Sequence, residues 1–77
     1  MSDELFRKQA RKIWNRLSKA DRKEVLLYMR VWSRSSGALF QLESGLKWDK
    51  LLPSTQDKLV GADFSMILGR EVSPETE

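Results

Sequence analysis

The chain has 77 residues, a formal net charge of +3 and 40% apolar side chains, a composition that suits one small globular domain and is too apolar for a disordered chain. It has no Cys and no His, which excludes disulfide scaffolds, thiol catalysis, Ser-His and Cys-His catalytic pairs, and the common zinc, copper and haem sites. Neither a signal peptide nor a run of about 18 apolar residues occurs, so we expect a cytoplasmic protein with no cofactor, no metal and no membrane partner.

The first predicted element is an amphipathic helix from Asp3 to Arg16. At about 100° per residue its apolar side chains fall on one stripe, and its basic side chains occupy the rest of the circumference. The stripe consists of Phe6, Ala10, Ile13, Trp14 and Leu17. The basic residues are Arg7, Lys8, Arg11, Lys12 and Arg16.

A second helix should begin at Lys19, because Ser18 to Asp21 has the Ser-x-x-acid spacing of a helix cap, and it should run to Trp32 or Ser35. Its principal apolar face should hold Val25, Tyr28, Met29 and Trp32, with a second apolar cluster of Ala20, Leu27 and Val31 on the far side. Its basic stripe consists of Lys19, Lys23, Arg30 and Arg34, with Leu26 beside it. A helix that is apolar on two sides is either central to the fold or offers one side to a partner.

The middle of the chain permits two interpretations. Gly37 should end the second helix, and two short helices over about 38–44 and 46–51 would then follow. Alternating apolar and polar residues over 39–49 also fit a short β-hairpin that turns at Ser44 and Gly45. We favour helices, because the flanking segments are helical and an isolated hairpin is marginally stable.

A last helix is predicted from Thr55 to Leu68. Pro53 precedes it, the segment from Ser54 to Asp57 repeats the capping spacing with Asp57 as the acid, and Gly69 should end it. Its buried face should hold Val60, Phe64, Ile67 and Leu68.

The predicted fold is therefore all-α: a small single domain over residues 1–70 with three main helices and an irregular or short-helical middle. Residues 71–77 are polar and acidic, and they should form a flexible tail.

Positive charge is concentrated at the start of the chain. Residues 1–34 carry ten basic and four acidic side chains, whereas residues 35–77 carry four basic and seven acidic ones. A face that serves only solubility usually mixes both signs. We therefore hypothesise a small non-enzymatic regulatory binding protein that engages nucleic acid or an acidic protein surface, with nucleic acid favoured. The candidate binding residues are Arg7, Lys8, Arg11, Lys12, Arg16, Lys19, Lys23, Arg30 and Arg34.

Two other functions fit the same sequence. One is a protein-protein interaction module, such as an inhibitor or adaptor of the phage or plasmid type, with Leu27, Val31 and Trp48 as partner contacts. The other is a small homo-oligomeric structural protein, for example a homodimer. Trp14 and Trp32 have core spacing, whereas Trp48 is the tryptophan to test for partial exposure and partner contact. We identify no catalytic residue and no metal ligand, because nothing in the sequence brings two carboxylates together.

Overall fold

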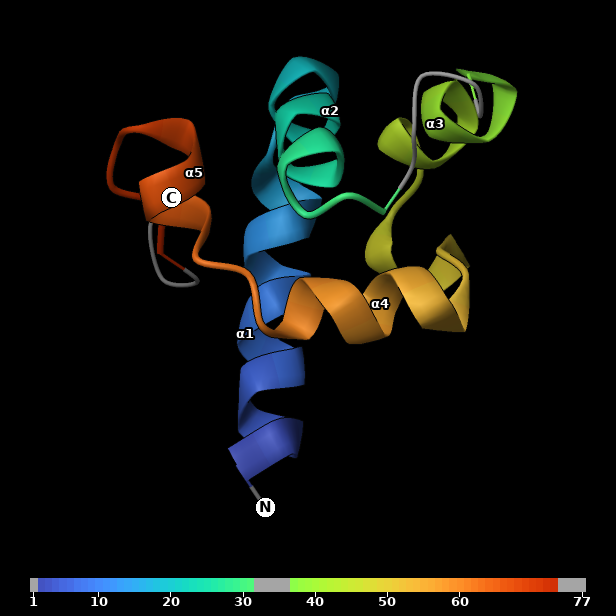
Figure 1. The fold of residues 1–77 in the computed structure, drawn as a ribbon. Helices are drawn as coiled ribbons and strands as arrows, with labels where there is room; N and C mark the ends of the chain where they lie inside the picture. The colour runs from blue at the N-terminus through green and yellow to red at the C-terminus, as the bar shows by residue number, and fades with distance from the viewer. Residues whose placement is uncertain (1, 32–36, 74–77) are drawn as a thin grey trace.

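Helix α1 is the longest element, and α4 crosses it (Figure 1). The computed structural model describes residues 2–31 and 37–73, and within these ranges all regular structure is helical. The elements are α1 (Ser2–Arg16), α2 (Lys19–Tyr28), α3 (Gly37–Ser44), the 3₁₀-helix η2 (Trp48–Lys50), α4 (Pro53–Val60) and α5 (Phe64–Leu68). The predicted all-α class is confirmed.

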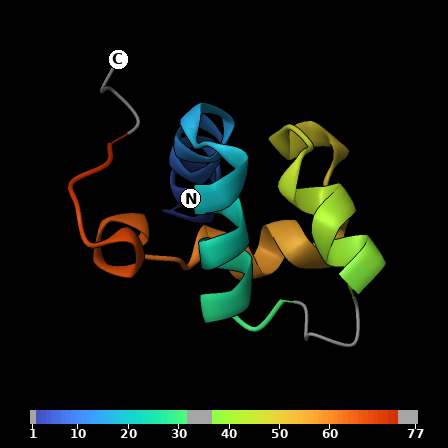
Figure 2. The same ribbon diagram turned by 90° about the horizontal axis from the view of Figure 1, so that it is seen from above.

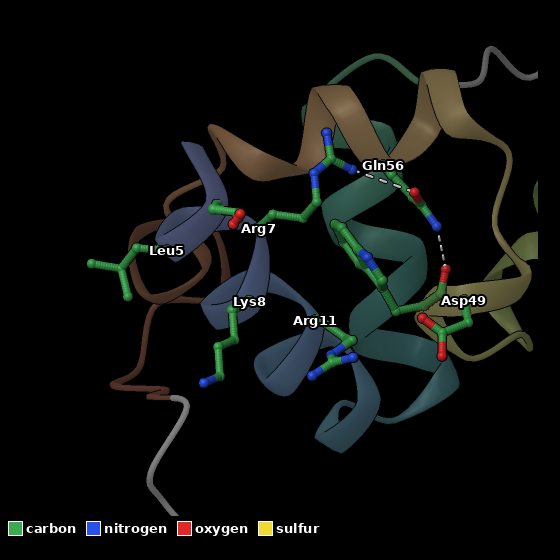
Figure 3. A pocket seen from close by; sticks show the side chains of 8 residues that line it. Leu5, Arg7, Lys8, Arg11, Asp49 and Gln56 are labelled. Atoms are coloured by element: carbon green, nitrogen blue, oxygen red, sulfur yellow. Dashed lines mark hydrogen bonds between the residues drawn. The ribbon is translucent and has the colours of Figure 1, made fainter. Parts of the chain in front are cut away.

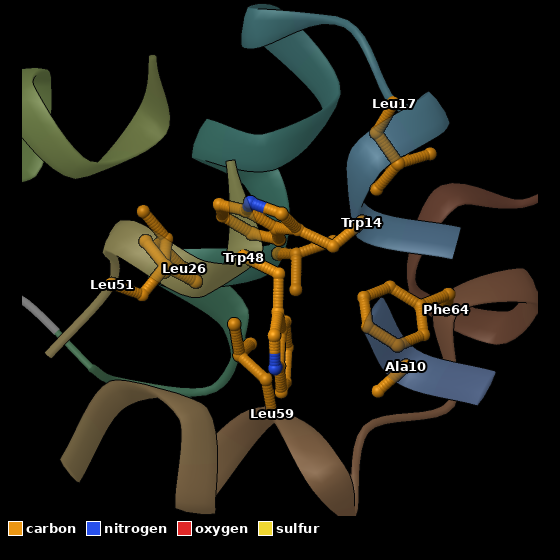
Figure 4. Close-up of a cluster of buried hydrophobic side chains, with 9 residues drawn as sticks. Ala10, Trp14, Leu17, Leu26, Trp48, Leu51, Leu59 and Phe64 are labelled. Carbon is orange, nitrogen blue, oxygen red and sulfur yellow. The ribbon is translucent and has the colours of Figure 1, made fainter. Parts of the chain in front are cut away.

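Two sets of contacts define the architecture. Helix α1 packs against η2 and α4, and α2 packs against α3 and α5. Seen from above, α3 and α5 lie on opposite sides of α2 (Figure 2). Buried side chains from five of these elements, together with Leu17 after α1 and Leu51 after η2, form one core (Figure 4). Its members are Ala10, Trp14, Leu17, Val25, Leu26, Trp48, Leu51, Leu59 and Phe64.

The first helix and its boundary agree with the prediction. Ala10, Trp14 and Leu17 are buried, although Phe6 is half exposed. The Ser18 hydroxyl accepts a hydrogen bond from the backbone N–H of Asp21 at 3.2 Å, as the capping spacing requires. Local side-chain chemistry therefore separates α1 from α2.

The prediction that α2 reaches Trp32 or Ser35 is wrong, because the helix ends at Tyr28. Arg30 adopts the left-handed conformation with φ 57°, and the N–H of Val31 donates to the Leu26 carbonyl at 3.0 Å. This is the Schellman arrangement, which usually has Gly at the left-handed position.

The predicted apolar face of α2 is also wrong in part. Leu26, which we grouped with the basic stripe, is fully buried, whereas Tyr28 is 56% exposed. The buried face is centred on Val25 and Leu26. Trp32 lies outside the described residues.

The middle segment is helical, so the alternative of a β-hairpin over 39–49 is wrong. Gly37 begins α3 and does not end α2. The second short element is a 3₁₀ turn and not an α-helix over 46–51.

The predicted single helix from Thr55 to Leu68 is two helices. Gly61 ends α4, and the Asp63 carboxylate accepts a hydrogen bond from the backbone N–H of Met66, which starts α5. Helix α4 begins at Pro53, a residue suited to the first helical position. The predicted capping role of Asp57 is wrong, because its carboxylate pairs with Arg7.

The start of α4 is held from outside the helix. The carboxylate of Glu43 on α3 accepts from the Leu52 backbone N–H and from the Thr55 hydroxyl, both at 2.8 Å. This places a negative group at the positive end of α4. The segment after α5 is tied back to that helix. Ser65 of α5 forms two hydrogen bonds with the backbone of Val72, which is half-buried. The predicted tail falls partly on residues 74–77, which lie outside the described residues.

Candidate functional site

The outer face of α1 carries the exposed cations that the sequence singled out. Lys8, Arg11 and Lys12 are exposed, and none of them forms an ion pair or a hydrogen bond with another residue of the described ranges. Arg16 is exposed near the C-terminal end of the helix, beside Arg70 and the backbone that follows it. The same helix therefore presents positive charge over about two turns.

Arg7 is held at the edge of this face. Its Nη2 lies 2.7 Å from Asp57 Oδ1, and its Nη1 donates to Gln56 Oε1 at 3.4 Å. Both partners belong to α4. Asp57 offsets the charge of Arg7, so this residue contributes less to the field than its neighbours.

The basic residues of α2 lie against a different helix. Lys23 Nζ lies 6.0 Å from the ring centroid of Phe40 on α3, a cation-π distance. Lys19 is exposed, and Arg30 occupies the left-handed end of α2. Arg34 lies outside the described residues. The α1 cations adjoin η2 and α4, whereas Lys23 adjoins α3, and the Arg30 carbonyl accepts from Lys58 of α4 at 3.4 Å.

A groove of about 530 Å³ lies where α1 meets η2 and α4 (Figure 3). Arg7, Lys8 and Arg11 line it from α1, and Gln56 and Asp49 lie on the other side. The remaining lining residues are Glu4, Leu5 and Trp48.

A chain of hydrogen bonds fixes the shape of this groove. The backbone N–H of Trp48 donates to Asn15 Oδ1 at 2.9 Å, which joins η2 to α1. Gln56 Nε2 donates to the Trp48 carbonyl at 2.7 Å, which joins α4 to η2, and Gln56 Oε1 accepts from Arg7. The walls come from three elements, yet their backbones are tied together.

Arg22 is a cation that the sequence could not distinguish from its neighbours, and the structure removes it from the surface. Its side chain is buried against Trp14 and donates only to backbone carbonyl oxygens. Burial lowers the pKa of this guanidinium, but the group remains charged at neutral pH. Arg22 therefore has a structural role.

The three predicted partner contacts differ in exposure. Leu27 is 47% exposed and lies next to Tyr28, whose hydroxyl contacts the sulfur of Met66 at 3.7 Å. Val31 is half-buried against the core. Trp48, the tryptophan considered for partial exposure, is buried, because only 3% of it is accessible. Its ring packs in a core formed by elements that are far apart in the sequence, so no local periodicity indicates its burial.

The carboxylates do not gather. Within the described ranges, no group of three or more acidic side chains lies close enough to hold a metal ion, and no helix is long and apolar enough to cross a bilayer. No protein-family model, curated protein or solved structure matches this chain. The surface of α1 and the groove beside it are thus the features from which a function can be argued.

Proposed function

We propose that this chain is a small regulatory protein of the cytoplasm that binds nucleic acid through the exposed cations of α1 and catalyses no reaction. The observation that supports this proposal is the exposure of Lys8, Arg11 and Lys12 without an acidic partner among the described residues. They span about 6 Å of helix at 1.5 Å per residue. Duplex DNA carries one charge per about 1.7 Å of its axis, so these cations can meet several phosphates together.

Charge, and not the stacking of bases on the rings of Trp14 or Trp48, should drive the interaction. Trp14 and Trp48 are buried in the core, so neither ring is available as a platform for bases. We therefore expect binding with little sequence preference. If three phosphates are neutralised, the logarithm of affinity should fall with the logarithm of salt at a slope of about −2.7 on duplex DNA.

Fluorescence anisotropy with labelled duplex and single-stranded DNA at two or more salt concentrations tests this proposal. The variant Lys8→Ala/Arg11→Ala/Lys12→Ala should lose most of its affinity and flatten the salt dependence. The control Lys47→Ala/Lys50→Ala/Lys58→Ala removes the same charge from exposed positions outside α1 and should bind nearly as the parent does. Absence of binding to either DNA at low salt, or equal losses in the two variants, would reject the proposal.

A second candidate function is a protein-interaction module, and the exposed apolar side chains of Leu27, Tyr28 and Met66 favour it, because Tyr28 and Met66 are in contact. Here Leu27→Asp should abolish capture of one defined protein partner. Leu42→Asp changes another exposed leucine, on α3, in the same way and should leave capture intact. Circular dichroism of both variants checks that the fold survives.

A further inference from the structure

We propose that the groove between α1, η2 and α4 seats one phosphate of the bound nucleic acid, held by Lys8, Arg11 and the indole N–H of Trp48. This inference rests on the proposed function and adds a defined contact to it. At about 530 Å³ the groove is large enough for a phosphate and part of its sugar.

The indole of Trp48 supplies the first argument. Its nitrogen makes no hydrogen bond with any residue of the described ranges, whereas the indole nitrogen of Trp14 donates to the Leu46 carbonyl at 2.9 Å. Among the described residues, every side-chain nitrogen that is fully buried has a hydrogen-bond partner. The Trp48 indole nitrogen has none, so it is not fully buried and its N–H contacts solvent. Trp48 lines the groove, and we therefore place its indole N–H there. A donor-only group there is suited to an acceptor such as a phosphate oxygen.

The walls supply the second argument. Lys8 and Arg11 are three residues apart on α1 and therefore lie on the same side of the helix. Arg7 is fixed by Asp57 and Gln56, and Gln56 is fixed in turn by the Trp48 carbonyl. Arg7, Gln56 and Trp48 would therefore not need to rearrange when a phosphate enters the groove, which lowers the entropic cost of binding.

Two carboxylates set the limits of this site. Glu4 and Asp49 also line the groove, and their charge opposes that of an anion. Free phosphate should therefore bind weakly. Asp49→Asn removes one of the opposing charges without changing the size of the side chain, so it should tighten binding.

Two-dimensional ¹H–¹⁵N spectra provide a direct measurement, because each of the three Trp indoles gives its own signal. Trp48→Phe or backbone-to-side-chain correlation assigns the Trp48 signal. Titration with inorganic phosphate, and separately with short duplex DNA, should shift this signal saturably and the Trp14 signal much less. Lys8→Ala/Arg11→Ala should abolish the shift with phosphate, and Lys12→Ala should preserve it.

A charge-matched pair completes the experiment. Asp49→Asn and Glu71→Gln each raise the net charge by one, but Glu71 lies beside Arg70, outside the groove. Asp49→Asn should tighten phosphate binding about threefold, as expected for a charge several ångströms away in a hydrated site, and Glu71→Gln should change it little.

The outcomes separate this inference from the proposed function. If DNA binds through α1 but the Trp48 signal does not move, and the two charge-matched variants behave alike, the groove assignment is overturned and the proposed function stands. If phosphate moves the signal but neither DNA binds at low salt, the proposed function is overturned, and so is the assignment of the phosphate to nucleic acid.

Discussion

The guanidinium of Arg22 lies over the indole of Trp14, with Cζ 5.3 Å from the ring centroid, and its Nε donates to the Trp14 carbonyl at 3.1 Å. Its Nη1 donates to the carbonyls of Leu46 at 3.1 Å and Ser44 at 3.4 Å, and the Trp14 indole donates to the same Leu46 oxygen. The last carbonyls of a helix lack i+4 donors, and at the end of α1 the Trp14 carbonyl accepts a single backbone bond, from the Leu17 N–H at 3.1 Å. One buried cation therefore satisfies the C-terminal ends of two helices.

Replacing this cation should destabilise the domain strongly. Arg22→Met preserves much of the apolar contact with Trp14 but removes the donor to the Asn15 and Ser44 carbonyls and one of the two donors to the Trp14 and Leu46 carbonyls. We expect this loss to cost about 2–3 kcal/mol of unfolding free energy. Arg22→Lys should recover only part of this, because a single ammonium lacks the fork that reaches both helix ends. Urea unfolding measures both changes.

Lys19→Met, at an exposed position on the same helix, is the control for the loss of one charge and should have a small effect. An unfolding free energy of Arg22→Met within about 0.5 kcal/mol of the parent, a typical effect of a surface substitution, would show that the carbonyls find other partners and would contradict this account.

The parts of the fold that were predictable from sequence depend on local signals. The first helix has a regular apolar stripe over 15 residues, and the spacing from Ser18 to Asp21 is typical of a cap, so both were confirmed. The same spacing from Ser54 to Asp57 did not form a cap, because α4 begins earlier, at Pro53. The end of α2 was missed because Arg30 stands where Gly would signal a left-handed cap. The break after α4 was missed although Gly61 lies there. The apolar residues on both sides of Gly61 keep helical spacing, so the pattern predicted one continuous helix.

The site was predictable only in its charge. The basic face of α1 follows from periodicity, and the structure exposes it. The burial of Arg22 and Trp48 depends on contacts between residues distant in sequence, such as Arg22 with Leu46 and Trp48 with Asn15. In the sequence Arg22 and Lys23 are two adjacent cations, and no local pattern tells which of them enters the core.

The contact of Glu43 with Thr55 should contribute to the attachment of α3 to α4. Thr55 is buried, and its hydroxyl donates to Glu43 Oε1 at 2.8 Å. Thr55→Val removes this donor with almost no change in volume, and we expect a loss of about 1–2 kcal/mol, since a hydrogen bond to a charged group is lost. In a double-mutant cycle with Glu43→Gln the two losses should not add. Additive losses would show that the two side chains do not interact.

Acid should weaken the domain through Asp21. The hydrogen bonds from Arg70 hold the pKa of the Asp21 carboxyl below its ordinary value of 3.8. The folded state thus binds this proton less readily than the unfolded state, so the stabilisation is complete above pH 3.8 and is lost as the pH falls below that value. Thermal melts between pH 2.5 and pH 6, on the order of the range where this group titrates, should show a flatter pH dependence in Asp21→Asn.

The Asp21 effect should be modest and should shrink in high salt, because the Arg70 side chain is largely exposed. Arg70→Gln removes the same ion pair by changing its cation. It should flatten the dependence of the melting temperature on pH to the same degree as Asp21→Asn. An unchanged pH dependence in both variants would exclude this pair as a source of acid sensitivity.

Opposite substitutions at two left-handed positions should have opposite effects on stability. Arg30 has φ 57° and Gly69 has φ 69°. In this left-handed region a residue with a Cβ atom is less favourable than glycine by about 1–2 kcal/mol. Arg30→Gly should therefore stabilise the domain by about 0.5–1 kcal/mol after the entropy cost of glycine, and Gly69→Ala should destabilise it by about 1 kcal/mol. Arg30→Ala removes the same charge but retains Cβ, so it should show no such gain in urea unfolding. A gain of equal size in Arg30→Ala would assign the effect to charge, and the Schellman geometry at the end of α2 would then carry no strain.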